Sequence, residues 1–155
     1  MKILRIQGKN LASIAGEFDI DFTAAPLRSA GIFAICGPTG AGKSTILDAI
    51  CLALFNNMPR TTGIEGTKMP DVGQEFIQQG DRRQILRRGT AEAMAAVEFI
   101  AVDGKSYRSV WRVWRANNKI SGKLQPAELR VYPLGDPSPI TTGISESENK
   151  LIQLI

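Results

Sequence analysis

The feature that most constrains the fold is the run GPTGAGKS at residues 37–44. It fits the pattern G-x-x-x-x-G-K-[ST], in which a glycine-rich loop leads from a strand into a helix and its N–H groups surround a phosphate. Gly40 and Gly42 stand where the loop needs positive φ angles that other residues disfavour. The motif therefore predicts an α/β fold of the P-loop NTPase class.

The same motif predicts what individual residues do. Lys43 would reach the β- and γ-phosphates as the catalytic cation, and Ser44 would place its hydroxyl on Mg²⁺. The segment NKIS at 118–121 lacks the aspartate of the guanine-recognition motif N-K-x-D, so the predicted cofactors are ATP and Mg²⁺. The predicted phosphate-loop residues are Gly37, Pro38, Thr39, Gly40, Ala41, Gly42, Lys43, Ser44 and Thr45.

The segments around the loop suit this motif. Residues 31–36 form a continuous apolar run, as expected of a strand covered on both faces, and residues 43–55 repeat apolar side chains at helical spacing. The pair Asp103-Gly104 predicts a tight hairpin turn. Further strands are predicted at residues 2–8, 16–22, 93–102, 106–115 and 128–132. The expected fold is a P-loop lobe flanked by a largely antiparallel β-sheet.

Two regions depart from this regular pattern. Residues 56–87 are rich in glycine, threonine and glutamine, which predicts a flexible loop insertion. Residues 145–155 begin like a helix, but the chain stops at the apolar pair Leu154-Ile155 inside it. This ending predicts that residues 1–155 are the N-terminal lobe of an ATPase head, truncated at its C-terminus.

Composition excludes several classes of protein. The 155 residues include no histidine, which excludes Ser-His-Asp and Cys-His catalytic systems, and two cysteines alone cannot complete a structural zinc site. There is no apolar run of membrane-spanning length and no signal peptide pattern, so a cytoplasmic protein without a membrane partner is expected. Residues 82–123 hold ten basic and three acidic residues, which is compatible equally with a polyanion as partner and with a solvated basic face.

Hydrolysis of ATP also needs a second carboxylate on Mg²⁺ and a residue that orients water. Asp103 follows four apolar residues, but the next residue is Gly104, and a hairpin turn explains Asp103 better. The chain thus reads as half of a nucleotide site. Two alternatives stay open: a self-contained small P-loop kinase or ATPase, and a DNA-binding module that nucleotide only regulates. An ABC transporter subunit is disfavoured because no aromatic residue ahead of the loop is placed to stack on adenine.

Longer stretches resemble a known family. The start MKILRIQGKNLAS, then GEFDIDF, GIFAICGPTGAGKSTILDAICLALF and TAEAMAAVEF, are similar to the SbcC family. These proteins are bacterial SMC-like ATPases of DNA double-strand-break repair. The similarity is strong over residues 1–59 and 88–114 and weak elsewhere. It implies an ABC/SMC-type head whose two halves lie at the ends of a long chain with an antiparallel coiled coil between them.

The resemblance also implies partners and an activity. A second copy of the ATPase would form a head dimer around two ATP molecules, and a nuclease subunit of the SbcD type would bind nearby. Closure of the heads on ATP would gate the cutting of double-stranded DNA ends and hairpins in repair, replication and recombination. The protein would lie in the cytoplasm with the nucleoid. The C-terminal half of its own head would supply the signature motif and the acidic residues, so the 155 residues alone would be inactive.

Three further residues are carried over from the family's K-N-x-x-S element, which lies beside the nucleotide. They are Lys9, Asn10 and Ser13, while Ala12 departs from the arginine that many relatives have near the phosphates.

DNA contact is predicted on the strand at 106–115. Its alternation puts Arg108, Arg112 and Trp114 on one face, and Arg115 follows them, which suits phosphate contact and base stacking. The alternative is a sheet with Trp111 in the core and the arginines in water.

Overall fold

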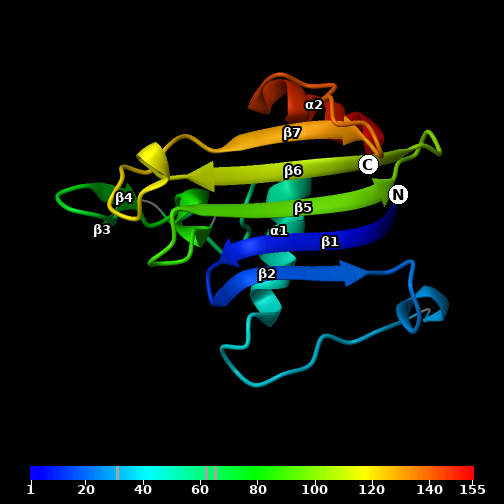
Figure 1. Ribbon diagram of the computed structural model, residues 1–155, viewed down its shortest axis with the longest axis horizontal. Helices are drawn as coiled ribbons and strands as arrows, with labels where there is room; N and C mark the ends of the chain where they lie inside the picture. The colour runs from blue at the N-terminus through cyan, green and yellow to red at the C-terminus, as the bar shows by residue number, and fades with distance from the viewer. Residues whose placement is uncertain (31, 62, 65) are drawn as a thin grey trace.

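A five-stranded antiparallel sheet dominates the computed structural model, which describes residues 1–30, 32–61, 63–64 and 66–155. The strands run side by side in the order β2-β1-β5-β6-β7 (Figure 1). They are β1 (Lys2–Leu11), β2 (Ile14–Asp21), β5 (Glu92–Ile100), β6 (Ser106–Trp114) and β7 (Glu128–Pro133). All five strands were predicted from sequence, with ends that differ by up to three residues.

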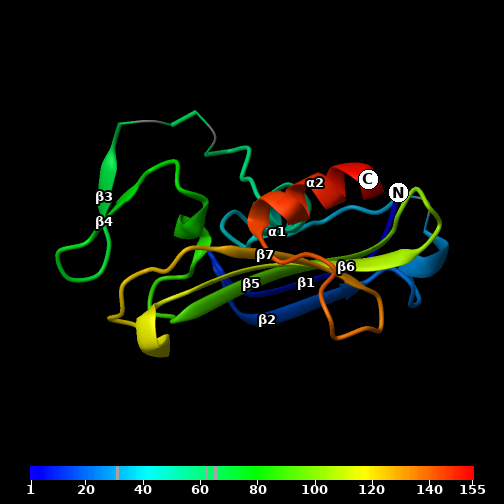
Figure 2. The ribbon, with the colours of Figure 1, turned by 90° about the horizontal axis from the view of Figure 1, so that it is seen from above.

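Two helices, α1 (Lys43–Phe55) and α2 (Ile144–Leu154), cover one face of this sheet (Figure 2). Because successive strand residues point to opposite faces, every second side chain of β5, β6 and β7 enters the layer between sheet and helices. The main side chains of this core are Val97, Phe99, Trp111, Val113, Leu129, Val131, Leu52 and Leu151, each at most 1% exposed. Burying a large apolar side chain contributes about 1.5–3 kcal/mol, so this layer stabilises the fold.

The far end of α1 is fixed against β6. The helix ends at Asn56, which takes a left-handed conformation and donates its backbone N–H to the carbonyl of Leu52. The Ser109 hydroxyl donates to the carbonyl of Ala53 at 2.6 Å, and Trp111 Nε1 donates to Asn56 Oδ1 at 3.0 Å. These bonds satisfy polar groups that burial would otherwise leave unpaired, so they set where α1 lies on the sheet.

The β5–β6 connection is the predicted hairpin. Ala101 N–H donates to the carbonyl of Lys105, and Gly104 takes a φ of 78° in the turn. Asp103 accepts from Lys105 N–H at 2.9 Å and from the Tyr107 hydroxyl at 2.8 Å. Asp103 is therefore a turn residue, and these bonds, the one from the Lys105 N–H first, hold its pKa below the ordinary value.

The strand predicted at residues 31–36 is wrong for the part that can be assessed. Gly31 lies outside the described residues, and residues 32–36 form neither strand nor helix. Ile32 is 95% exposed, Phe33 49% and Ile35 41%. A buried strand needs hydrogen-bonded neighbours, and the described sheets contain none for this segment.

The predicted loop insertion at 56–87 carries regular structure. Strands β3 (Lys68–Pro70) and β4 (Phe76–Gln78) pair as a hairpin that projects from the body of the molecule (Figure 2), and a 3₁₀ turn spans Arg82–Ile85. Two residues of the predicted loop, 62 and 65, lie outside the described residues, and flexibility of the segment stays a prediction. None of the helices in the described part of the chain is long and apolar enough to span a membrane.

Candidate nucleotide-binding site

The predicted phosphate loop leads directly into α1. Gly40 and Gly42 have φ angles of 84° and 91°, in the left-handed region that only glycine adopts without strain. Helix α1 starts where Ile46 N–H donates to the carbonyl of Gly42, and its first turn has no acidic residue and no side-chain cap. The N–H groups of this turn are thus left for an anion, which the helix dipole also favours.

Lys43 bends back over the loop. Its Nζ donates to the carbonyl of Gly37 at 2.7 Å and to that of Pro38 at 2.8 Å. The ammonium group is therefore held above the glycine-rich backbone, where phosphate oxygens can take the place of the two carbonyls as acceptors. Ser44 is exposed beside it, while Thr45 is only 3% exposed.

The turn between β1 and β2 packs closely against the loop. Ser13 Oγ lies 3.4 Å from Thr45 Oγ1. A Cβ at Gly42 would lie 2.5 Å from Ile14 Cγ1 and 3.3 Å from Ser13 Oγ, so the turn leaves no room for a side chain there. The structure thus brings Ser13 to the phosphate loop, together with Ile14, which the sequence did not single out.

Lys9 and Asn10 are held away from the loop. Lys9 Nζ pairs with Glu92 at 2.7 Å and with Glu17 at 3.6 Å, and the Glu92 bond raises the pKa of Lys9. Asn10 Nδ2 donates to the carbonyl of Glu92 at 3.2 Å, and its Oδ1 accepts from Gly16 N–H at 3.1 Å. These contacts join β1 to its neighbours in the sheet, so the two residues support the turn instead of touching the loop.

A buried carboxylate lies on α1 itself. Asp48 is 5% exposed and pairs with Arg60 at 2.6 Å; burial raises its pKa, and Arg60 opposes this shift. The pair ties the segment after α1 to the helix. In the sequence, the only indication of this pair is an acidic residue within an otherwise apolar helix. No group of three or more His, Cys, Asp or Glu side chains that could hold a metal is found among the described residues.

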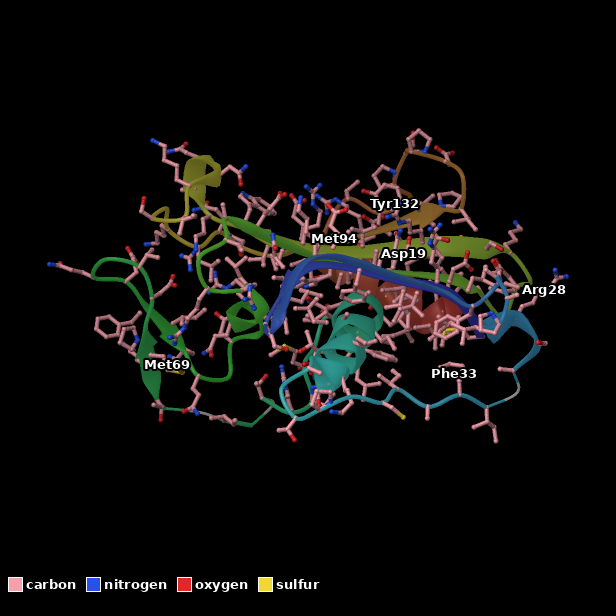
Figure 3. The ribbon with its side chains drawn as sticks, turned by 60° about the horizontal axis from the view of Figure 1, so that its bottom comes forward. Asp19, Arg28, Phe33, Met69, Met94 and Tyr132 are labelled. Atoms are coloured by element: carbon pink, nitrogen blue, oxygen red, sulfur yellow. The ribbon has the colours of Figure 1, made fainter. Side chains whose placement is uncertain are left out.

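The predicted DNA-contacting residues lie on the sheet face opposite α1, except Arg115. Arg108 Nη2 donates to Gln7 Oε1 at 2.8 Å, and its Nε lies 3.9 Å from Glu98. Arg112 is exposed and Trp114 half-buried. Arg115 is 8% exposed and forms two bonds with Asp71, at 2.6 and 3.0 Å, which anchor the β3–β4 hairpin. Figure 3 shows Met94, Tyr132 and Asp19 on this outer face, whereas Phe33 lies on the side of α1.

The outer face carries charges of both signs. Register pairs place carboxylates beside the cations, and several form ion pairs, such as Arg5 with Asp19 at 2.5 Å. The cations of these strands are Lys2, Arg5, Lys9, Arg108, Arg112 and Arg130, and the carboxylates are Glu17, Asp19, Asp21, Glu92, Glu98 and Glu128. The basic excess of residues 82–123 is therefore not an excess on this face.

Comparison with known proteins identifies the relatives. The chain is 53% identical to the SbcC subunit of the nuclease SbcCD from Pseudomonas aeruginosa over 135 residues, which is 86% of this chain and 11% of that protein. It is 53% identical to the SbcC subunit from Rhodobacter capsulatus over 126 residues, 81% of this chain and 10% of that protein. A probable DNA double-strand break repair Rad50 ATPase of Aquifex aeolicus is 33% identical over 135 residues, 87% of this chain and 11% of that protein.

These matches confirm the resemblance to SbcC that the motifs indicate, and the chain spans about a tenth of the length of these curated relatives. The family described as AAA domain matches residues 5–152, from β1 into α2. The matched residues include the whole phosphate loop and the turn that packs on it. The chain accordingly belongs to the AAA domain family of P-loop NTPases.

Proposed function

We propose that this chain is the ATP-binding lobe of the ATPase subunit of an SbcCD-type nuclease complex. The observation that carries the proposal is the phosphate loop, with its two glycines at positive φ and Lys43 held over the backbone. The relatives that are 53% identical are named as subunits of that nuclease.

The residues of the loop fit Mg²⁺-ATP. The first-turn N–H groups of α1 would bind the β-phosphate, Lys43 would bind the β- and γ-phosphates, and the exposed Ser44 hydroxyl would face the metal. Bound Mg²⁺ neutralises phosphate charge and orients the terminal phosphate. Thr45 is buried beside Ser13, so its hydroxyl would contribute to the phosphate site together with the β1–β2 turn.

The lobe would function as one half of an ATPase head that is completed by a second half. Exposed apolar side chains lie on the segment before the loop and on the outer side of α1: Ile32, Phe33, Ile35, Leu47 and Phe55. We propose that the C-terminal half of the same head covers them, pairs with residues 32–36, and brings the catalytic carboxylates. A second copy would then close on the nucleotide as an ABC/SMC-type dimer.

The names of the relatives support a proposal for the remaining partners. We propose an SbcD-type nuclease subunit that cuts double-stranded DNA ends and hairpins when ATP closes the heads, in the nucleoid-containing cytoplasm. DNA would touch this lobe at the exposed end of β6, where Arg112 and Trp114 share the outer face with Arg108. Arg115 is left out because Asp71 already binds its guanidinium.

The DNA proposal has its own test. Changing Arg108 and Arg112 to Glu in the assembled complex should weaken duplex binding and lower the slope of log affinity against log salt by about one to two. The effect is modest because carboxylates already surround both arginines. An affinity and a salt slope equal to those of the unchanged complex would remove DNA from this face.

Binding of Mg²⁺-ATP tests the central proposal. Lys43→Ala removes the charge-assisted bonds to phosphate, worth about 1.5–3 kcal/mol, so the Kd measured by calorimetry should rise by about ten- to a hundredfold. Lys68→Ala, on the projecting β3 strand, removes the same charge away from the loop and should leave the Kd unchanged. Equal Kd values for the two variants would contradict the proposal, and turnover by a lone monomer would favour a self-contained ATPase.

A further inference from the structure

We infer that Arg87 is a positioning residue for the nucleotide site and acts on the phosphate loop through the β1–β2 turn. The inference rests on the function proposed above. Arg87 Nη1 donates to the carbonyl of Ala12 at 2.9 Å and to that of Ser13 at 2.9 Å. One guanidinium nitrogen thus holds two consecutive carbonyls of the turn that packs on the loop.

The backbone beside Arg87 holds the same turn. Arg87 N–H donates to the carbonyl of Asn10 at 3.0 Å, and Ala12 N–H donates to the carbonyl of Ile85 at 2.7 Å. Leu11 and Leu86 form an isolated antiparallel bridge between these bonds. Residues 85–87 therefore run along the end of β1 as a short extra strand. Beyond the last backbone hydrogen bond, the Arg87 side chain contacts the next residues of the turn.

The turn needs this support because its backbone is in an unfavourable conformation. Asn10 and Ala12 have φ angles of 51° and 44°, in the left-handed region. Asparagine tolerates that region, but alanine has no side-chain group to compensate there. Such conformations persist only where surrounding contacts impose them, and the bonds from Arg87 and to Ile85 flank Ala12 directly.

The turn passes this constraint to the loop. Ser13 follows Ala12, and its hydroxyl lies 3.4 Å from Thr45 Oγ1 in the first turn of α1. Ser13 and Ile14 also fill the space over Gly42, the residue at which α1 begins. A turn released from Arg87 would shift Ser13 and Ile14 and would leave the loop and the first N–H groups of α1 less well ordered for phosphate.

Arg88 offers a matched control. It is exposed, and within the described part of the chain it makes no hydrogen bond or ion pair. Arg87→Met and Arg88→Met each remove one positive charge beside the turn and keep an aliphatic stem. Only the first removes the bonds to the turn, so the pair separates positioning from general attraction of an anion.

The experiment compares Arg87→Met, Arg88→Met and Arg87→Lys in the full-length protein. Arg87→Met should raise the KM for ATP about tenfold with kcat within twofold, because the loop is misplaced before ATP binds. Arg88→Met should change KM less than twofold. Arg87→Lys keeps an ammonium donor for the carbonyls and should recover most of the affinity. Amide exchange without nucleotide should quicken at residues 12–14 and 40–43 in Arg87→Met only.

Equal KM values for Arg87→Met and Arg88→Met, or an unchanged exchange rate at 40–43, would overturn the inference. If the unchanged protein bound no ATP, the proposed function itself would fail instead. Should Arg87→Met not fold, the unchanged protein still decides: ATP should slow exchange at residues 85–90 as well as at the loop. Protection confined to the loop would then contradict the role of Arg87.

Discussion

Two apolar regions of this molecule end in opposite environments. On the inner face of the sheet, Val97 and Trp111 have no exposed surface, because α1 packs over them. In the segment before the phosphate loop, Ile32 and Phe33 are apolar residues like Val97 and Trp111, yet they are 95% and 49% exposed. The difference shows that an apolar pattern predicts that a segment will be buried. It does not predict which other segment or chain will pack against it. The first region is covered within the chain, whereas the second is left exposed, and we propose that the other half of the head covers it.

The largest expected effect is on stability in the first region. Trp111→Ala removes a fully buried ring and the bond from Nε1 to Asn56, so the free energy of unfolding should fall by about 3–5 kcal/mol. Phe33→Ala, which removes an exposed ring, should cost less than about 1 kcal/mol. Urea denaturation followed by circular dichroism measures both. Equal losses would show that the two regions do not differ.

A smaller effect is expected in the phosphate loop, which follows the second region. Gly42→Ala would force a Cβ into a left-handed residue, 2.5 Å from Ile14 Cγ1, and should destabilise by about 2–3 kcal/mol and abolish most ATP binding. Gly40→Ala is the matched control, since its φ is 84° but nothing lies within 4 Å of the new methyl group. It should cost only about 1 kcal/mol. A Gly42→Ala protein with unchanged melting temperature and ATP affinity would show that the turn does not constrain the loop.

The smallest effect concerns the bond that joins β1 to β5 near the turn. The bond from Lys9, opposed by partial burial, lowers the pKa of Glu92 from its ordinary 4.5. The ionised form is therefore favoured in the folded state, and its stabilisation is present above pH 4.5 and lost as the pH falls through the lowered pKa. Glu92→Gln should cost less than about 1 kcal/mol at pH 7, since the pair is partly exposed, and progressively less as the pH falls below 4.5. A difference that does not change with pH would rule out the ion pair as its source.

Local pattern was sufficient for most of the fold. Helix α1 is predicted from Lys43 to Phe55 and observed there, because glycine precedes it and the apolar spacing is helical throughout. The Asp103-Gly104 turn is likewise a local signal. The exposed conformation of residues 32–36 could not be predicted, because an apolar run does not reveal whether a strand there would find hydrogen-bonded neighbours.

The candidate site was predictable where a motif covers it. The loop residues and Ser13 come from short patterns, and the structure brings Ser13 beside Thr45. Arg87 could not be assigned to the site, because its contacts join residues 74 and 75 positions apart in the chain. Arg115 looked free for DNA on charge alone, whereas Asp71, 44 residues away, binds it. Charge counts along a sequence do not include such partners.

The central claim, that the 155 residues hold half of a nucleotide site, is tested most directly by ATP turnover. Residues 1–155 should bind Mg²⁺-ATP in a way that depends on Lys43 and should not hydrolyse it, because the carboxylates of the site would come from the other half of the head. Adding that C-terminal half should restore hydrolysis. Rapid, Lys43-dependent hydrolysis by the monomeric 155 residues alone would contradict the account and place the catalytic carboxylate within this chain.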